Sequence, residues 1–195
     1  MTFNSDIHHR RSIRLKDYDY SRAGAYFVTI CAFQRECLFG EIIEGKMHLN
    51  TLGLKVVECW QRLADHFPHL TLDESVIMPN HFHGIVHIGD TPDFGSPQAD
   101  SGEAGESLAS PLHLPLLQGT VAGSLGAIVQ NFKSVSTRKI NVLRQNRGCP
   151  LWQRNYYERV IRNETELARA REYIANNPMK WELDKENPAN VLKAE

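Results

Sequence analysis

The segment from Val76 to Ile88 contains two histidines that flank one bulky apolar residue, within a run of β-branched and aromatic side chains. Side chains alternate between the two faces of a strand, so His81 and His83 point to one side and Phe82 points to the other. Two imidazoles side by side on a rigid strand supply half of a divalent-metal site. The segment therefore predicts a sheet with an apolar layer on one face and a polar site on the other.

Length and composition are those of one globular domain. The chain has 195 residues, of which 42% are hydrophobic and 23% are charged, which is enough to bury a core. No apolar run approaches the roughly 20 residues that span a bilayer, and the N-terminus lacks the apolar core of a signal peptide. The four cysteines form no CxxC pair and are expected to be reduced thiols. These features predict a cytoplasmic protein without a membrane partner.

The net charge of −1 conceals a strong asymmetry along the chain. Residues 90–118 carry five acidic residues and no lysine or arginine, and their Gly, Ser and Pro content without periodicity predicts a flexible insert. Residues 119–162 carry eight basic residues against one acidic residue. Such an excess is typical of a polyanion-binding face, although a solvated helix surface would have the same composition.

Hydrophobic periodicity predicts an alternation of strands and helices. Six strands are expected, at residues 26–33, 38–43, 46–49, 72–78, 81–88 and 156–161. Three helices are expected, at residues 51–67, 124–143 and 163–177, and the last of them has Asn163 at its N-cap and Pro178 after its end. Hairpins that alternate with helices predict an α+β fold of the ferredoxin-like or RRM-like kind, an antiparallel sheet with helices packed mainly on one face.

The final predicted helix places Tyr173 and Asn177 four residues apart, on one face. A tyrosine hydroxyl is a poor nucleophile at its usual pKa of about 10, but beside a cation that polarises a phosphate it can attack phosphorus. An asparagine one turn further along could supply another ligand to a cation held by the two histidines. A helix that docks across the sheet from the histidine strand would bring these groups together.

Three blocks of the chain resemble the single-tyrosine HUH transposases, and among these the REP-associated tyrosine transposases. They are the segments Ala25–Ile30 with Glu36–Glu41, Pro79–His83, and Trp152–Arg162 with Glu172–Pro178. The middle block is similar to the motif of histidine, bulky apolar residue and histidine that gives the HUH endonucleases their name. A lone pair of histidines at this spacing is common, whereas the three blocks in this order are specific. The resemblance covers about residues 10–180 outside the insert.

The resemblance implies the HUH endonuclease fold and a DNA transposase, a single-strand DNA endonuclease that cleaves and rejoins hairpin-containing DNA. His81 and His83 would then hold Mg²⁺ or Mn²⁺ together with Asn177, where mobile-element relatives often have glutamine. Tyr173 would be the nucleophile that forms a 5′-phosphotyrosine linkage and leaves a free 3′ hydroxyl. The implied partners are REP-like palindromes or element ends, bound in the nucleoid by a monomer or a homodimer.

Basic residues expected to contact DNA phosphates lie in the 124–143 helix, in the segment before the last helix and near the N-terminus; they are Lys133, Arg138, Lys139, Arg154, Arg159, Arg162, Arg11 and Arg14. Trp152, Tyr156 and Tyr157 could stack on unpaired bases or pack in the core. The expected organisation is a basic arm over residues 1–22, the HUH domain over 23–180, and a tail over 181–195.

Each assignment has an alternative that the sequence leaves open. The two histidines could be polar residues on a solvent-facing strand, Tyr173 an ordinary helix tyrosine, and Asn177 a helix C-terminal residue before Pro178. Tyr156 and Tyr157 are rival nucleophiles that lack an asparagine one turn away. At the level of function, the alternatives are a catalytically silent, sequence-specific hairpin-binding protein and a metallohydrolase that uses activated water.

Overall fold

The centre of the protein is a four-stranded antiparallel sheet. The computed structural model describes residues 18–90 and 120–191. The sheet has the strand order β4–β5–β1–β6, and its strands are β1 (Gly24–Cys31), β4 (Leu70–Ile77), β5 (His81–Ile88) and β6 (Tyr157–Ile161). Helices connect β1 to β4 and β5 to β6, which gives the βαββαβ arrangement of a ferredoxin-like fold. The predicted fold class is confirmed.

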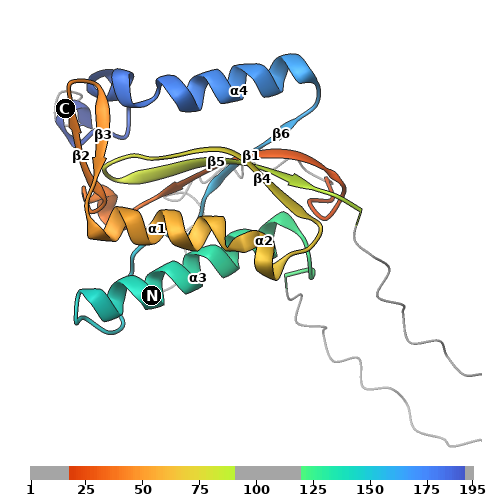
Figure 1. The fold of residues 1–195 in the computed structure, drawn as a ribbon, viewed down its shortest axis with the longest axis horizontal. Helices are drawn as coiled ribbons and strands as arrows, with labels where there is room; N and C mark the ends of the chain where they lie inside the picture. Colours follow the sequence, from red (N-terminus) through yellow and green to blue (C-terminus); the bar gives the residue numbers. More distant parts are fainter. Residues whose placement is uncertain (1–17, 91–119, 192–195) are drawn as a thin grey trace, which may run out of the picture.

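Helices cover both faces of the sheet unequally (Figure 1). One face is covered by α1 (Thr51–Gln61), α2 (Leu63–His66) and α3 (Leu125–Leu143), and the other by α4 (Glu164–Asn176). Asn163 caps α4 as predicted, because its Oδ1 accepts a hydrogen bond from the Glu166 N–H. The sheet therefore separates two helical layers, with α1, α2 and α3 on one face and the predicted tyrosine helix, α4, on the other.

The predicted helix over residues 51–67 is divided into α1 and α2 at Arg62. Asn50 begins α1 by accepting hydrogen bonds from the N–H groups of Leu52 and Gly53. Arg62 then leaves the helical region, with ψ at 0°, and its N–H reaches the carbonyls of both Glu58 and Trp60. The tightened turn breaks the regular spacing that the apolar pattern alone had predicted.

Alternation along the strands creates two apolar layers. The larger core lies between the sheet and α1 and α3, and Phe82 contacts Trp60 and Phe132 there. The smaller core lies between the sheet and α4; it contains Phe27, Ile85, Ile161, Leu167 and Ile174. The histidine strand therefore has Phe82 in the larger core and its histidines on the α4 side, as the alternation predicts.

The chain after α4 folds back beside a small hairpin. This hairpin is β2 (Gly40–Ile43) paired with β3 (Lys46–Leu49), and it follows the 3-10 turn η1 (Phe33–Arg35). Pro178 ends α4 as predicted, but the chain continues as the 3-10 helix η2 (Pro178–Leu183) and then α5 (Pro188–Val191). The C-terminal segment thus lies beside both the hairpin and the end of α4 (Figure 1).

Two predicted segments fall largely outside the described residues, namely the basic arm over residues 1–22 and the insert over residues 90–118. Among the helices of the described part, none has the length and apolar character needed to cross a membrane. The four cysteines are all described, and all are free thiols.

Candidate active site

Strand β5 carries His81 and His83 on the sheet face that α4 covers. Both side chains are buried, and their Nε2 atoms lie 3.0 Å apart. Two ligands at right angles, each about 2.1 Å from a cation such as Mg²⁺, stand about 3 Å apart. The pair is therefore spaced for two adjacent coordination positions. The alternative of two histidines on a solvent-facing surface is wrong.

Asn80 fixes the protonation of the first histidine. Its Nδ2 donates to the carbonyl oxygens of Arg35 and Glu186, at 3.0 Å and 2.7 Å. Carbonyls only accept, so Oδ1 is the atom that lies 2.9 Å from His81 Nδ1. Because Oδ1 also only accepts, Nδ1 carries the hydrogen and Nε2 presents a lone pair. Asn80 thus sets the tautomer of His81 and leaves its Nε2 able to bind a cation, a role that the sequence did not reveal.

Thr29 on β1 contacts the second histidine. Its Oγ1 lies 2.8 Å from His83 Nδ1, and a hydroxyl can either donate or accept. In the structure, His83 Nε2 donates to the lone pair of His81 Nε2, and the hydroxyl donates to Nδ1. If both Nε2 atoms held a cation, the His83 hydrogen would be on Nδ1 and the hydroxyl would accept it. Thr29 can therefore bond to either tautomer of His83.

Burial keeps both imidazoles neutral at physiological pH. It lowers the pKa of His81 to about 4, although the charge of Asp184 opposes this shift. Burial, together with the neighbouring His81, also lowers the pKa of His83 well below its usual value. Neutral imidazoles retain the lone pairs that bind a cation.

Helix α4 places Tyr173 beside this pair. Its ring centroid lies 5.2 Å from that of His83 and 5.9 Å from that of Phe27, and both contacts are edge-on. The side chain is 45% exposed, so the residue is accessible from solvent. Burial of the remainder raises the pKa of the hydroxyl, and the Asn177 side chain opposes this shift. The hydroxyl is therefore protonated at neutral pH.

Asn177 is buried one turn beyond the tyrosine, at the end of α4. Its Oδ1 has no hydrogen-bond partner within the part of the chain that the structure describes. A buried amide oxygen is costly unless something satisfies it. This oxygen is suited to a cation, which is the role the sequence predicts for Asn177.

An ion pair at the sheet edge holds α4 in place. Arg171 donates through Nε and Nη2 to both carboxylate oxygens of Asp73 on β4, at 3.0 Å and 2.7 Å. His87 Nε2 lies 2.8 Å from the same carboxylate. Arg171 and then His87 hold the pKa of Asp73 well below its usual range. Because Arg171 precedes Tyr173 by two residues, this contact positions the tyrosine.

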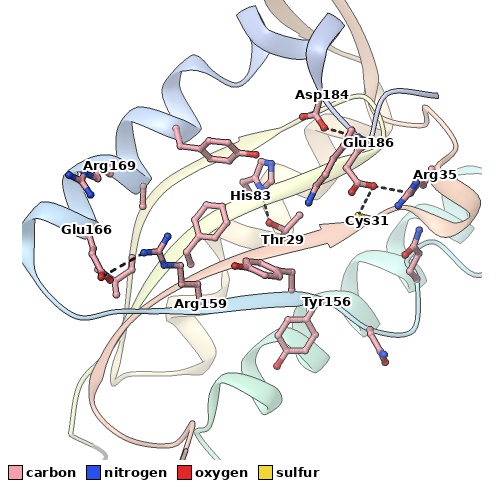
Figure 2. A pocket seen from close by; sticks show the side chains of 18 of the residues that line it. Thr29, Cys31, Arg35, His83, Tyr156, Arg159, Glu166, Arg169, Asp184 and Glu186 are labelled. Atoms are coloured by element: carbon pink, nitrogen blue, oxygen red, sulfur yellow. Dashed lines mark hydrogen bonds and ion pairs between the residues drawn. The ribbon is translucent and has the colours of Figure 1, made fainter. Parts of the chain in front are cut away.

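A cavity of about 920 Å³ is lined by Tyr173 and His83. Figure 2 shows it from close by, with His83 labelled. Five cationic residues line it against three acidic ones; they are Arg35, Arg154, Arg159, Arg169 and Lys185, against Glu166, Asp184 and Glu186. Cys31 also lines it, but burial raises the pKa of this thiol to about 12, so it is not a thiolate nucleophile. The cavity is suited to an anionic ligand that reaches the tyrosine.

Two of the arginines predicted to contact DNA lie in this cavity, Arg154 and Arg159. Arg162 follows β6 and is exposed. Arg11 and Arg14 lie outside the described residues. Arg154, Arg159 and Arg162 therefore lie on the edge strand β6 or close to it in the sequence.

The basic residues of α3 lie on the opposite face of the sheet. Lys133 Nζ donates to two main-chain carbonyls, those of residues 153 and 154, at 2.7 Å and 2.9 Å. Lys139 Nζ lies 3.0 Å from Glu58 Oε1 on α1. Arg138 is exposed and lines a second cavity of about 600 Å³. The first two side chains therefore have internal partners, and Arg138 is the one of the three that the structure leaves most open to a ligand.

The aromatic residues of the third block divide between core and cavity. Trp152 is buried in the larger core, and its Nε1 donates to Ser136 Oγ at 2.9 Å. Tyr156 packs against the same core and lines both cavities. Tyr157 is 41% exposed in the larger cavity. Tyr157 is therefore the residue of the three that is free to stack on a base.

Asp184 is a site residue that the sequence did not single out. Its Oδ2 lies 3.8 Å from His81 Nε2. It reaches the site because η2 turns the chain back after α4 (Figure 2). Across residues 18–90 and 120–191, no three His, Cys, Asp or Glu side chains form a ready-made metal cluster. The predicted set of two histidines and an asparagine differs from such a cluster because its third ligand is an amide oxygen.

Comparison with known proteins places the chain in a family. No protein-family model matches it. A protein of Haemophilus influenzae (strain Rd), named only as an uncharacterized protein, is 43% identical over 190 residues, which cover 93% of this chain and 95% of that protein. The chain belongs to the same family as that protein.

The fold is shared with a solved structure. The structure of a REP-associated tyrosine transposase bound to a REP hairpin aligns with this chain at a TM-score of 0.53 and 17% identity. The alignment covers 86% of this chain and 74% of the transposase chain. The protein described here therefore has the α+β fold of the HUH transposases. At this identity the likeness establishes the fold, and the roles of individual residues have to be argued from the site itself.

Proposed function

We propose that this protein is a metal-dependent single-strand DNA endonuclease and strand transferase that acts through Tyr173. The observation that carries the proposal is the placement of Tyr173, 5.2 Å from the ring of His83, over a buried histidine pair with its Nε2 atoms 3.0 Å apart. A protein that only binds DNA needs neither an accessible tyrosine nor neutral, correctly spaced imidazoles.

The cation would be Mg²⁺ or Mn²⁺, held by His81, His83 and the Oδ1 of Asn177, which has no hydrogen-bond partner among the described residues. When bound, it supplies Lewis-acid polarisation of the scissile phosphate. Asn80 and Thr29 orient the imidazoles. The ion pair between Asp73 and Arg171 on α4 holds the tyrosine in place.

The reaction is a transesterification at phosphorus. Tyr173 Oη forms a bond to phosphorus while the bond from phosphorus to the 3′ oxygen breaks, and the tyrosine proton is lost as the leaving oxygen gains one. The products are a 5′-phosphotyrosine linkage and a free 3′ hydroxyl. Attack by a 3′ hydroxyl on this linkage reverses the bonds and rejoins strands, so no external energy source is required.

The substrate we propose is single-stranded DNA next to a hairpin. The excess of arginine and lysine around the cavity favours a polyanion, and exposed Tyr157 offers a ring on which an unpaired base can stack. Arg154 and Tyr156 line both cavities, which provides a path from the active site around β6 toward Arg138 on α3. The hairpin itself is suggested by the REP hairpin bound in the transposase of the same fold.

The test is a denaturing gel of the protein mixed with labelled hairpin DNA that carries single-stranded tails, with Mn²⁺. Wild type should give a denaturation-resistant protein–DNA band and Tyr173→Phe should give none. Tyr157→Phe is the matched control, because this tyrosine is exposed in the same cavity, and it should retain the band.

Other outcomes identify the alternatives. A native-gel shift without any covalent band would indicate a hairpin-binding protein. Cleavage without a band, unaffected by Tyr173→Phe, would indicate a metallohydrolase that uses activated water. Either result would refute the tyrosine mechanism.

A further inference from the structure

The segment after η2 brings a carboxylate to the histidine pair. Asp184 Oδ2 lies 3.8 Å from His81 Nε2, and the Asp184 side chain is only 9% exposed. Its other oxygen, Oδ1, accepts a hydrogen bond of 2.7 Å from the Glu186 N–H. One carboxylate oxygen is therefore fixed by the local turn, while the second lies toward the imidazole.

This segment is anchored to the residues that orient the histidines. The Asn80 amide that sets the His81 hydrogen also donates to the Glu186 carbonyl at 2.7 Å. The Glu186 carboxylate lies 2.8 Å from Arg35 Nε, and both residues lie on the same side of the cavity in Figure 2. Asp184 is thus held relative to His81 by hydrogen bonds that run through Asn80 and the Glu186 main chain.

The predicted cation site has no negative charge without Asp184. Its histidines are neutral, and Asn177 contributes an amide oxygen. Mg²⁺ and Mn²⁺ are hard cations that favour carboxylate oxygens. The 3.8 Å between Asp184 Oδ2 and His81 Nε2 exceeds by only about 1 Å the roughly 3 Å expected between two adjacent ligands of such a cation. Because Oδ1 is the tethered atom, Oδ2 is the oxygen that would be available to the cation.

We propose that Asp184 is an anionic ligand of the divalent cation held by His81 and His83. The inference rests on the proposed function, because it requires the histidine pair to bind a cation. It makes residues 184–187 part of the active site, although they lie beyond both the histidine strand and the tyrosine helix. Cation binding then also fastens the C-terminal segment to the sheet.

The test measures Mn²⁺ binding to the full-length protein without DNA, by electron paramagnetic resonance of free Mn²⁺. Asp184→Asn removes the charge but keeps an oxygen that can accept from the Glu186 N–H. It should weaken Mn²⁺ binding by at least about tenfold. Glu182→Gln is the matched control, because it removes an exposed acid two residues away, and it should leave the affinity unchanged.

A thermal-unfolding series separates lost binding from lost stability. Each variant is compared with itself in the absence and presence of Mn²⁺, and Asp184→Asn should show a smaller Mn²⁺-dependent rise in Tm than wild type. An unchanged Mn²⁺ affinity in Asp184→Asn would overturn the proposal. A stronger affinity would also overturn it, because it would mean that the carboxylate competes with the cation for the histidines.

His81→Ala distinguishes this inference from the proposed function. If His81→Ala abolishes Mn²⁺ binding and Asp184→Asn leaves the Mn²⁺ affinity unchanged, only the role of Asp184 is overturned. If wild type itself shows no saturable Mn²⁺ binding, the metal-dependent function and the role of Asp184 are both overturned.

Discussion

Replacing Asn80 by alanine separates the orientation of His81, a proposed metal ligand, from the general stability of the fold. The side chain is fully buried and makes three hydrogen bonds, two to carbonyl oxygens and one to His81 Nδ1. Asn80→Ala removes all three. His81 is then free to place its hydrogen on Nε2, the atom that would otherwise present a lone pair to the cation.

The magnitude follows from the groups left without partners. Each buried group that loses its hydrogen bond costs about 1 kcal/mol or more, so Asn80→Ala should lower the free energy of unfolding by about 3 kcal/mol. Loss of a residue that orients a metal-binding histidine typically weakens metal affinity by about 10- to 100-fold. The weaker metal affinity is expected in addition to the lower stability, and it should be seen in the protein that is still folded.

The assay pairs urea denaturation with Mn²⁺ titration, and the control is Asn50→Ala. Asn50 also makes three hydrogen bonds, at the start of α1 and away from the site. Its loss should lower stability by about 1–2 kcal/mol and leave Mn²⁺ affinity unchanged. If Asn80→Ala lowers stability but binds Mn²⁺ as wild type does, the account of how His81 is oriented is refuted.

Three further outcomes are expected. Gly84→Ala should cost about 1–3 kcal/mol in urea denaturation, because a Cβ there would lie 2.6 Å from two aromatic side chains of the larger core; an unchanged midpoint would contradict this packing. The folded pKa of His81 is about 4, below its unfolded value of about 6.5, so the unfolded chain binds the extra proton and stability falls as pH drops through this window. NMR of the metal-free protein should therefore show neutral His81 at pH 5.5, and a charged imidazole there would contradict the burial argument. Asp73→Asn should slow adduct formation while hairpin binding persists, because it weakens the tie to Arg171 on the tyrosine helix, and an unchanged rate would remove that positioning role.

Much of the site could be predicted because its parts have local signatures. The alternation around Phe82 fixes the face on which the two histidines lie, and an Asn cap with early acids fixes the start of α4. Once α4 has to cover the face that the other helices leave bare, Tyr173 comes to lie beside His83. Local pattern and layer packing together are sufficient for this part.

The remaining features depend on contacts between distant segments. Asp184 is one acid in a polar stretch, and only the turn of η2 shows that it reaches His81. A count of basic residues cannot tell that Lys133 is engaged by main-chain carbonyls, or that Lys139 pairs with Glu58 on the far face. Charge along the sequence therefore predicts a polyanion partner better than it predicts which side chains contact it.

The most direct test of the central claim is to identify the residue that becomes joined to DNA. The covalent product would be digested with nuclease and trypsin and analysed by mass spectrometry. Tyr173 lies alone among tyrosines in the tryptic peptide 172–180, whereas the rivals Tyr156 and Tyr157 share the peptide 155–159. The account predicts a nucleotide remnant on peptide 172–180. A remnant on peptide 155–159, or on neither peptide, would contradict it.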